Sequence, residues 1–329
     1  MNFTGAARIL QIHPTRRCNL RCLHCYSDSS PDAVDELAVE VVTRVVREAA
    51  ELGYTVLSVS GGEPFLYRPL PQLLAAAKAN GMSTQLVSNG TAITRQRLDE
   101  VRDCLDLLAV SIDGMPDDHD RMRAQPGSFR RLEERLGLVR DGGMKLGMLF
   151  TLTMWNAHRI AWAVDFALAH GARLLQVHPL QATGRAVGLA EDVPDETEAT
   201  AALLECLRLQ QSLGDRLTIQ VDIATSSRLR PLTECQDYGP QQRFSDIVSP
   251  LVIEPDGICV PLEYGFVRDY ALGDVRTASL RGLADRWMGR CLPAYLSGLA
   301  SMNAKLAAGR DCVVVDGYAM VRETLAVNG

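Results

Sequence analysis

The feature that most limits the fold of this chain is a regular alternation of short apolar runs with longer amphipathic stretches over its first 180 residues. This alternation is typical of repeated βα units, in which parallel strands are joined by helices. Strands of this kind are predicted at residues 7–14, 56–60, 84–87, 107–112, 146–153 and 174–177. The pattern therefore predicts an α/β fold with repeated βα units around a parallel sheet or barrel, and six units fall short of the eight in a complete TIM-type barrel.

The rhythm of the pattern changes after residue 181. A long helix is predicted at 196–213 and a strand at 217–222, and two runs at 248–253 and 257–261 indicate a hairpin. Two further helices are expected close to the end of the chain. We therefore predict two domains: a barrel core at residues 1–223 and a C-terminal α+β extension at residues 224–329.

Composition excludes several classes of partner. The 34 basic and 40 acidic residues give a net charge of −6, so no basic surface favours nucleic acid or an anionic membrane. No apolar run is long enough to span a membrane, and no secretory signal precedes the first cysteines. Nine cysteines, an odd number, fit thiols or metal ligands better than disulfides. We expect a cytoplasmic protein.

Three cysteines directly after the first predicted strand carry the strongest chemical signal. Cys18, Cys22 and Cys25 form a C-x3-C-x2-C pattern. Thiolates hold iron–sulfur clusters, and three local thiolates leave one iron of a 4Fe-4S cluster open for a cofactor. The alternatives are three unrelated buried thiols or a structural zinc site with His24 as the fourth ligand.

Further polar and glycine residues follow the next predicted strands. Gly61 and Gly62 permit a sharp turn and a close approach of the backbone, and Glu63 adds a negative charge. Asn89 lies in a second turn, where turn formation by itself is a sufficient explanation. Ser111 and Asp113 alternate along the fourth strand and therefore share one face. Enzymes that are built on βα barrels have their active sites at the carboxyl ends of the strands.

In order and spacing, these motifs resemble the radical S-adenosylmethionine (SAM) superfamily, and within it the branch of SPASM and twitch peptide-modifying enzymes. The resemblance covers about residues 7–190. It includes the cysteine loop, Ser-Gly-Gly-Glu-Pro at 60–64, Ser-Asn-Gly at 88–90, Val-Ser-Ile-Asp-Gly at 110–114 and His-Asp-Arg-Met-Arg at 119–123. It implies a partial (β/α)6 barrel of TIM type, with which the six predicted units agree. It also implies a 4Fe-4S cluster on Cys18, Cys22 and Cys25, with SAM beside it at the carboxyl ends of the strands.

The resemblance also implies the cofactor-binding residues. Tyr26 either packs on the adenine or shields the cluster from water. Arg123 is either a clamp for a carboxylate or an exposed helix cation. The full set of implied SAM contacts is Tyr26, Gly61, Gly62, Glu63, Asn89, Ser111, Asp113 and Arg123.

Candidate catalytic residues lie further along the chain. His178, at the predicted end of the sixth strand, either faces the active site or has a structural role. The extension resembles a SPASM or twitch domain but has no C-x2-C pair, and Leu262 stands where relatives have a cysteine. A pair of auxiliary clusters is therefore not expected. Cys235 or Cys259 is a candidate hydrogen-atom donor to a substrate radical.

We therefore predict an enzyme that uses its reduced cluster to cleave SAM and then abstracts a substrate hydrogen. The leading expectation is maturation of a ribosomally synthesised peptide. The alternatives are a dehydratase, decarboxylase or epimerase acting on a sugar, nucleoside or other small intermediate, and a non-enzymatic iron–sulfur or zinc module. Expected partners are an external electron donor such as flavodoxin or ferredoxin and, since little chain precedes residue 7, a separate leader-peptide-binding protein.

Overall fold

The computed structural model describes residues 7–227, 229, 242–309 and 312–327, so Cys235 lies outside the described residues. The strands are β1 (Ile9–Ile12), β2 (Val56–Val59), β3 (Ser83–Ser88), β4 (Leu107–Ile112), β5 (Leu146–Leu152), β6 (Leu174–Pro179), β7 (Thr218–Val221), β8 (Ala224–Thr225), β9 (Leu251–Ile253), β10 (Ile258–Pro261), β11 (Gly273–Asp274) and β12 (Val313–Val314). Within the described part of the chain, ten strands form one sheet in the order β11-β10-β9-β1-β2-β3-β4-β5-β6-β7, and β8 pairs with β12.

Helices connect these strands. The α-helices are α1 (Val39–Glu51), α2 (Leu70–Ala79), α3 (Arg95–Val101), α4 (Pro116–Met122), α5 (Ser128–Asp141), α6 (Ile160–Ala169), α7 (Glu196–Leu213), α9 (Phe244–Ile247), α10 (Leu280–Arg290), α11 (Leu292–Ala308) and α12 (Gly317–Val327). The 3-10 helices are η1 (Pro64–Leu66), η2 (Arg102–Cys104), η3 (Ala157–Arg159), η4 (Gly184–Asp192), η5 (Gly214–Arg216) and η6 (Arg268–Tyr270).

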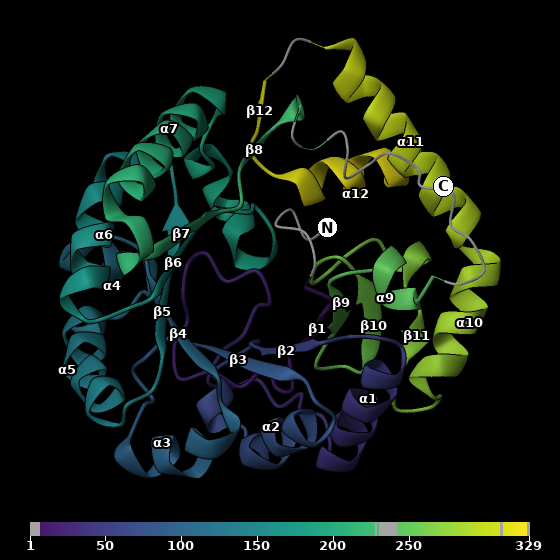
Figure 1. The fold of residues 1–329 in the computed structure, drawn as a ribbon, viewed down its shortest axis with the longest axis horizontal. Coiled ribbons are helices and arrows are strands. Elements are labelled where there is room, and N and C mark those ends of the chain that lie inside the picture. Colours follow the sequence, from purple (N-terminus) through teal and green to yellow (C-terminus); the bar gives the residue numbers. More distant parts are fainter. Residues whose placement is uncertain (1–6, 228, 230–241, 310–311, 328–329) are drawn as a thin grey trace.

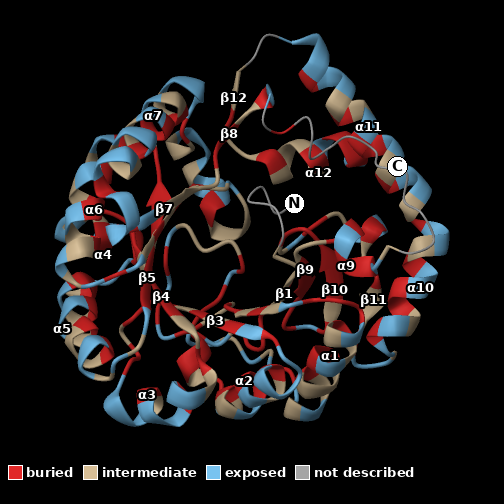
Figure 2. Cartoon of the chain, in the orientation of Figure 1, coloured by how far each residue is buried: buried red, intermediate tan, exposed pale blue. Residues whose placement is uncertain are grey.

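The strands β1 to β7 are all parallel to their neighbours and curve into an arc, with α1 to α7 on its outside (Figure 1). Figure 2 shows buried residues along the strands and exposed residues on the outer helix faces. On β5, for example, six of seven residues are buried, as expected for a parallel strand covered on both faces. The predicted partial barrel is confirmed.

Two helices differ from what the sequence pattern indicates. Hydrophobic periodicity over residues 32–52 predicts a helix that begins at residue 32, but α1 begins at Val39, because the preceding residues bind the loop after β1: Arg16 N donates to Asp35 O and Leu37 N to Pro14 O. Helix α4 was not predicted, since it is short, polar and begins at a proline. Such a helix has little hydrophobic periodicity to reveal it.

The C-terminal extension continues the barrel sheet. Strand β9 pairs in parallel with β1 and antiparallel with β10, which confirms the predicted hairpin, and β11 follows β10. The predicted boundary between residues 223 and 224 lies between β7 and β8, while the sheet joins both segments through β1 and β9. On α10, Trp287 is 1% exposed and its Nε1 donates to Tyr270 O at 2.8 Å.

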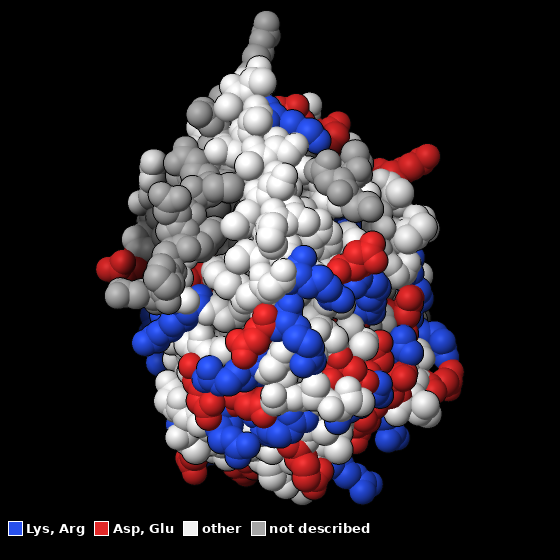
Figure 3. All heavy atoms as spheres, turned by 90° about the vertical axis from the view of Figure 1, so that its right-hand side faces the viewer, with Lys and Arg blue, Asp and Glu red and all other residues white. Residues whose placement is uncertain are grey.

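Helix α10 carries exposed charges of both signs, among them Arg281 and Asp285, whereas α11 has one charged residue, Lys305. On the side of the molecule seen in Figure 3, acidic and basic side chains are interspersed over the lower half, with few charges above. Among the described helices, none has the length and apolar character needed to cross a membrane.

A buried polar contact joins the extension to the barrel. Glu263, in the loop after β10, accepts from Gln181 Nε2 at 3.3 Å and from Arg322 Nη1 at 2.7 Å. Gln181 follows β6 and also donates to Asp316, just before α12, at 3.0 Å. Burial, followed by the nearby charge of Asp316, raises the pKa of Glu263 to about 7. Burial and Asp316 therefore outweigh Arg322 and Gln181, which by themselves lower the pKa of Glu263.

This raised pKa predicts a pH-dependent stability. Glu263 has an ordinary pKa near 4.5, so between about pH 4.5 and 7 the folded state holds a proton that the unfolded state has lost. Its contribution to the free energy of unfolding is present below pH 4.5 and decreases as the pH rises through 7. We expect E263Q to gain on the order of 2 kcal/mol relative to wild type between pH 5 and pH 8.

Urea unfolding at the two pH values measures this difference. E323Q, at an exposed position of the same helix as Arg322, is the matched control and should follow the wild type. An E263Q variant with the same pH dependence as the wild type would contradict the prediction.

Candidate active site

The three candidate ligand cysteines lie on the loop between β1 and α1, in the middle of the arc of strands (Figure 1). The turn after β2 holds this loop through its backbone: the N–H groups of Gly62 and Glu63 donate to the carbonyls of Thr15 and Arg17, both at 2.9 Å. A Cβ atom on Gly62 would lie 2.2 Å from Arg17 O. The space that this glycine leaves is therefore filled by the cysteine loop itself.

A second clamp comes from η4 after β6. Arg185 donates through Nε to Cys22 O at 2.9 Å and through Nη2 to Ser29 O at 2.7 Å. Its backbone N–H donates to Cys25 O at 3.0 Å. Sequence suggests a substrate-binding cation or an exposed loop residue at this position, but the structure uses Arg185 to hold the cysteine loop.

The thiols themselves are close to one another and largely shielded. Cys18 and Cys22 are each 7% exposed and pack with Leu20, and Cys25 is half-buried beside them. Burial, together with the negative charge of Glu63, raises the pKa of Cys18 to about 12. Burial also raises the pKa of Cys22. Metal ligation requires thiolates, which burial disfavours at Cys18 and Cys22. A bound metal cation must therefore stabilise the ionised form of these thiols.

Each thiol has a polar side chain within hydrogen-bond range. Asn89 Nδ2 lies 3.7 Å from Cys18 Sγ, and Arg123 Nη1 lies 3.8 Å from Cys22 Sγ. Ser27 Oγ lies 3.5 Å from Cys25 Sγ. The three donors come from the turn after β3, the end of α4 and the cysteine loop. Donors to ligand sulfur orient the ligands and tune the group that they bind.

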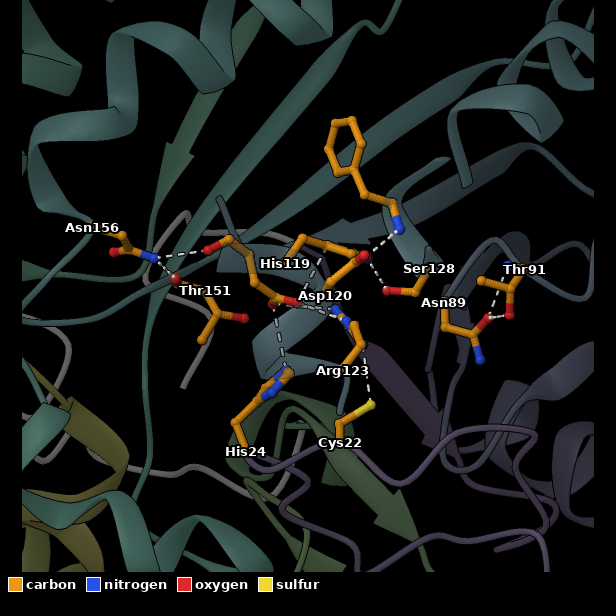
Figure 4. A network of polar contacts seen from close by, with 12 residues as sticks. Cys22, His24, Asn89, Thr91, His119, Asp120, Arg123, Ser128, Thr151 and Asn156 are labelled. Atoms are coloured by element: carbon orange, nitrogen blue, oxygen red, sulfur yellow. Dashed lines mark hydrogen bonds and ion pairs between the residues drawn. The ribbon is translucent and has the colours of Figure 1, made fainter. Parts of the chain in front are cut away.

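Asp113 is the centre of a buried polar network (Figure 4). Its carboxylate accepts from Arg123 Nε at 2.6 Å and from Nη2 at 3.2 Å, and it lies 3.4 Å from His24 Nε2 and 3.5 Å from His119 Nδ1. Burial by itself would raise the pKa of Asp113, but Arg123 and the two histidines lower it below the usual range. Burial lowers the pKa of both histidines to about 4. At neutral pH the network is therefore an ion pair flanked by neutral imidazoles.

Arg123 is not the exposed helix cation that sequence left as an alternative, because only 6% of the residue is exposed. Ser111 lies on β4 and is half-buried. It comes two residues before Asp113, so both side chains are expected on the same face of the strand.

Glu63 and Asn89 connect two strand ends to the thiols. The Glu63 carboxylate is fully buried and accepts from Phe65 N, Ser88 Oγ and Asn89 N at 2.9 to 3.1 Å. Asn89 Oδ1 accepts from Thr91 N at 2.9 Å, which is turn formation, while its Nδ2 reaches the cysteine loop. Asn89 therefore forms the turn and also contacts a candidate ligand thiol.

Tyr26 points toward the extension. Its ring centroid lies 5.8 Å from that of His13 and 5.5 Å from that of Tyr264, and His13 stacks on Tyr264 at 4.9 Å. Tyr264 follows Leu262, whose φ of 68° is uncommon for a residue with a side chain. The loop that resembles a cluster-binding segment in relatives thus supplies an aromatic ring and, through Glu263, a carboxyl group.

The predicted catalytic residues have different locations. His178 is half-buried near the end of β6, and its Nε2 lies 3.4 Å from Thr151 Oγ1 on β5. Asn156 Nδ2 donates to the carbonyls of Thr151 and Asp113 and so joins this strand pair to the Asp113 network (Figure 4). Cys259 is fully buried on β10 in the main hydrophobic core, so the structure does not bring it to the three thiols.

The donor set fits an iron–sulfur cluster. Among the residues that the structure describes, no three His, Cys, Asp or Glu side chains form a group that could hold a single metal ion. His24, the candidate fourth zinc ligand, is directed at Asp113. Three soft sulfur atoms on one loop, each with its own donor, are suited to a multi-iron cluster.

A partial βα barrel with a three-thiol loop at its centre defines a class of cofactor-dependent enzymes. Residues 12–167 match the Radical SAM superfamily model, and the chain contains a radical SAM domain. The cofactors of this enzyme family are a 4Fe-4S cluster and SAM.

Two curated relatives differ in how much of the chain they match. The Fe-coproporphyrin III synthase of Methanosarcina barkeri is 34% identical over 153 residues, which cover 46% of this chain and 38% of the relative. The PqqA peptide cyclase of Methylocella silvestris is 29% identical over 281 residues, or 80% of this chain and 72% of the relative.

A solved structure with the same fold is Streptococcus suis SuiB bound to S-adenosylmethionine, with a TM-score of 0.66 and 16% identity. The match covers 85% of this chain and 65% of SuiB.

Sequence reasoning missed several residues of the site. His24 was considered only as a zinc ligand, and His119 only as part of a motif; both face Asp113. Ser27 and Asn156 were not singled out. Asn156 could have been found as a polar residue that closely follows a barrel strand. The sequence around Ser27 does not distinguish it from other loop serines.

The close packing at Gly62 predicts the effect of one methyl group. Because the clash in G62A is with backbone atoms of Arg16 and Arg17, the cysteine loop must move. We expect a loss of about 1–3 kcal/mol in unfolding free energy and at least a fivefold loss of bound iron after reconstitution. The control is G137A, in the helix α5 with no atom within 4 Å, which should retain its iron and be slightly stabilised. Equal iron contents in the two variants would contradict this assignment.

Proposed function

We propose that this chain is a radical SAM enzyme that binds a 4Fe-4S cluster through Cys18, Cys22 and Cys25 and removes a hydrogen atom from a peptide substrate. The observation that carries the proposal is the convergence of the three thiols with Asn89 and Arg123 at the carboxyl ends of the strands. When bound, the cluster supplies one electron for the reductive cleavage of SAM, which provides a deoxyadenosyl radical.

The residues around the thiols have separate tasks in this proposal. Gly61, Gly62 and Glu63 form the turn that fixes the cysteine loop and borders the SAM site. Arg123 presents guanidinium N–H groups suited to a carboxylate, and Asp113 prevents the guanidinium from rotating. The remaining SAM contacts in the proposal are Asn89, Ser111 and Tyr26.

His178 is the proposed substrate-side residue. It lies near the carboxyl end of β6, the edge of the sheet where barrel enzymes place catalytic groups. Its Nε2 lies 3.4 Å from the Thr151 hydroxyl, and the side chain is half-buried, which leaves part of the imidazole accessible to a substrate. Cys259 has no part in the proposal, because it is buried in the core.

Two comparisons support a peptide as the substrate. The PqqA peptide cyclase match extends over both the barrel and the extension. SuiB, whose fold this chain shares, has also been crystallised with its precursor peptide SuiA. An external one-electron donor protein is also part of the proposal, because cluster reduction requires an electron that the chain itself does not supply.

A small-molecule substrate is the second candidate. It is favoured by the Fe-coproporphyrin III synthase, whose match has the higher identity but covers less than half of either protein. The extension contributes Glu263 and Tyr264 to the barrel mouth. It distinguishes the peptide candidate from the small-molecule candidate, because the peptide cyclase match extends over it.

Anaerobic reconstitution with iron and sulfide tests the chemistry. We expect about four irons per wild-type chain, and deoxyadenosine on addition of SAM and dithionite. In a triple variant of Cys18, Cys22 and Cys25 to Ala, the iron content and the deoxyadenosine formation should both fall at least a hundredfold. C104A removes a cysteine outside the loop and should match the wild type. Iron content near zero in the wild type, or deoxyadenosine formation by the triple variant, would reject the proposal.

Substrate class is tested with the reconstituted enzyme and SAM. We expect a pool of short synthetic peptides to increase deoxyadenosine formation at least threefold, because a bound substrate orders the barrel mouth and consumes the radical. A matched pool of small molecules, made up of sugars, nucleosides and tetrapyrroles, should leave the rate unchanged. An increase with the small-molecule pool and none with the peptides would establish the second candidate.

A further inference from the structure

The three candidate ligand thiols are unequal in their electrostatic surroundings. Cys18 has a neutral amide donor, Asn89, and Cys25 a neutral hydroxyl, Ser27. Cys22 has a guanidinium, because Arg123 Nη1 lies 3.8 Å from its sulfur. One thiol of the loop therefore faces a full positive charge.

That charge is held in place and poorly screened. Arg123 is 6% exposed, and its Nε and Nη2 atoms are engaged by Asp113, so Nη1 is the atom directed at the sulfur (Figure 4). Asp113 is fully buried, and its main-chain carbonyl accepts a hydrogen bond from the Asn156 side-chain Nδ2 at 3.1 Å. Interactions between buried charges are screened much less by salt than those at the surface.

We infer that Arg123 is a positioning residue that raises the reduction potential of the cluster, and that Asp113 sets how far the potential rises. This inference rests on the proposed function, since it requires a cluster on Cys22. An electron added to a thiolate-bound cluster increases its negative charge, and a fixed cation nearby stabilises that reduced form. The Asp113 carboxylate opposes part of the effect and also keeps the guanidinium beside the sulfur.

The two members of the ion pair should therefore act in opposite directions. Removing the positive charge with R123Q makes reduction harder. Removing the negative charge with D113N makes it easier, because the guanidinium is then uncompensated. A purely structural role for the pair predicts damage of the same kind from both substitutions.

The test is a potentiometric titration of the reconstituted cluster, followed by its EPR signal, without SAM or substrate. We expect R123Q to have at least a tenfold lower ratio of reduced to oxidised cluster at a given potential, which for one electron is a negative shift of about 59 mV. D113N should shift the potential in the positive direction. R123K, which retains the charge, should restore most of the wild-type value.

R121Q is the matched control. Arg121 is on the helix α4 that ends beside Arg123, so R121Q removes one positive charge from the same region. Its guanidinium lies 4.2 Å from the centroid of the Trp155 ring. We expect no shift in R121Q. The iron content of the wild type and of each variant is measured first. A wild-type protein without iron would reject the proposed function.

If R123Q keeps its iron and has the wild-type potential, this inference is wrong while the proposed function stands. Equal shifts in R123Q and R121Q, or a negative shift in D113N, would likewise overturn it.

Discussion

The ion pair of Asp113 and Arg123 is the interaction on which the arrangement of the site depends. Both partners are buried, and a buried pair is tolerated only when its remaining hydrogen-bonding capacity is used. Here Arg123 reaches Cys22, and the Asp113 carboxylate is flanked by His24 and His119. Loss of one partner would leave an uncompensated buried charge, at a cost of about 3–5 kcal/mol. The pair thus ties β4, α4 and the cysteine loop into one unit.

The cysteine loop has little regular structure of its own and is held from several sides. Gly62 and Glu63 bind its first half through main-chain bonds, and Arg185 binds the second half through the carbonyls of Cys22 and Ser29. Backbone polar groups that are buried must find partners, and here the barrel strand ends provide them. The loop is consequently positioned by elements that are far apart in sequence, which suits a site that has to hold three ligands in a defined arrangement.

The extension contributes a carboxyl group and an aromatic ring to the barrel mouth. Leu262 has a positive φ, and the two residues after it reach the barrel: Glu263 binds Gln181, and Tyr264 stacks on His13. Because β9 pairs directly with β1, this loop is held next to the first barrel strand. The extension therefore contributes to the barrel mouth, whatever the substrate.

The order of the elements and the candidate ligands could be predicted from the amino-acid sequence. Parallel strands have continuous apolar runs and their helices a regular period, so the βα units and the hairpin at 248–261 were predictable. The spacing of the three cysteines identified them as candidate ligands. Three further features arise from the folded chain: Arg123 is buried on Asp113, Arg185 binds the cysteine loop, and Cys259 lies in the core. Spacing records neighbours along the chain, whereas these contacts join residues 10 to 163 positions apart.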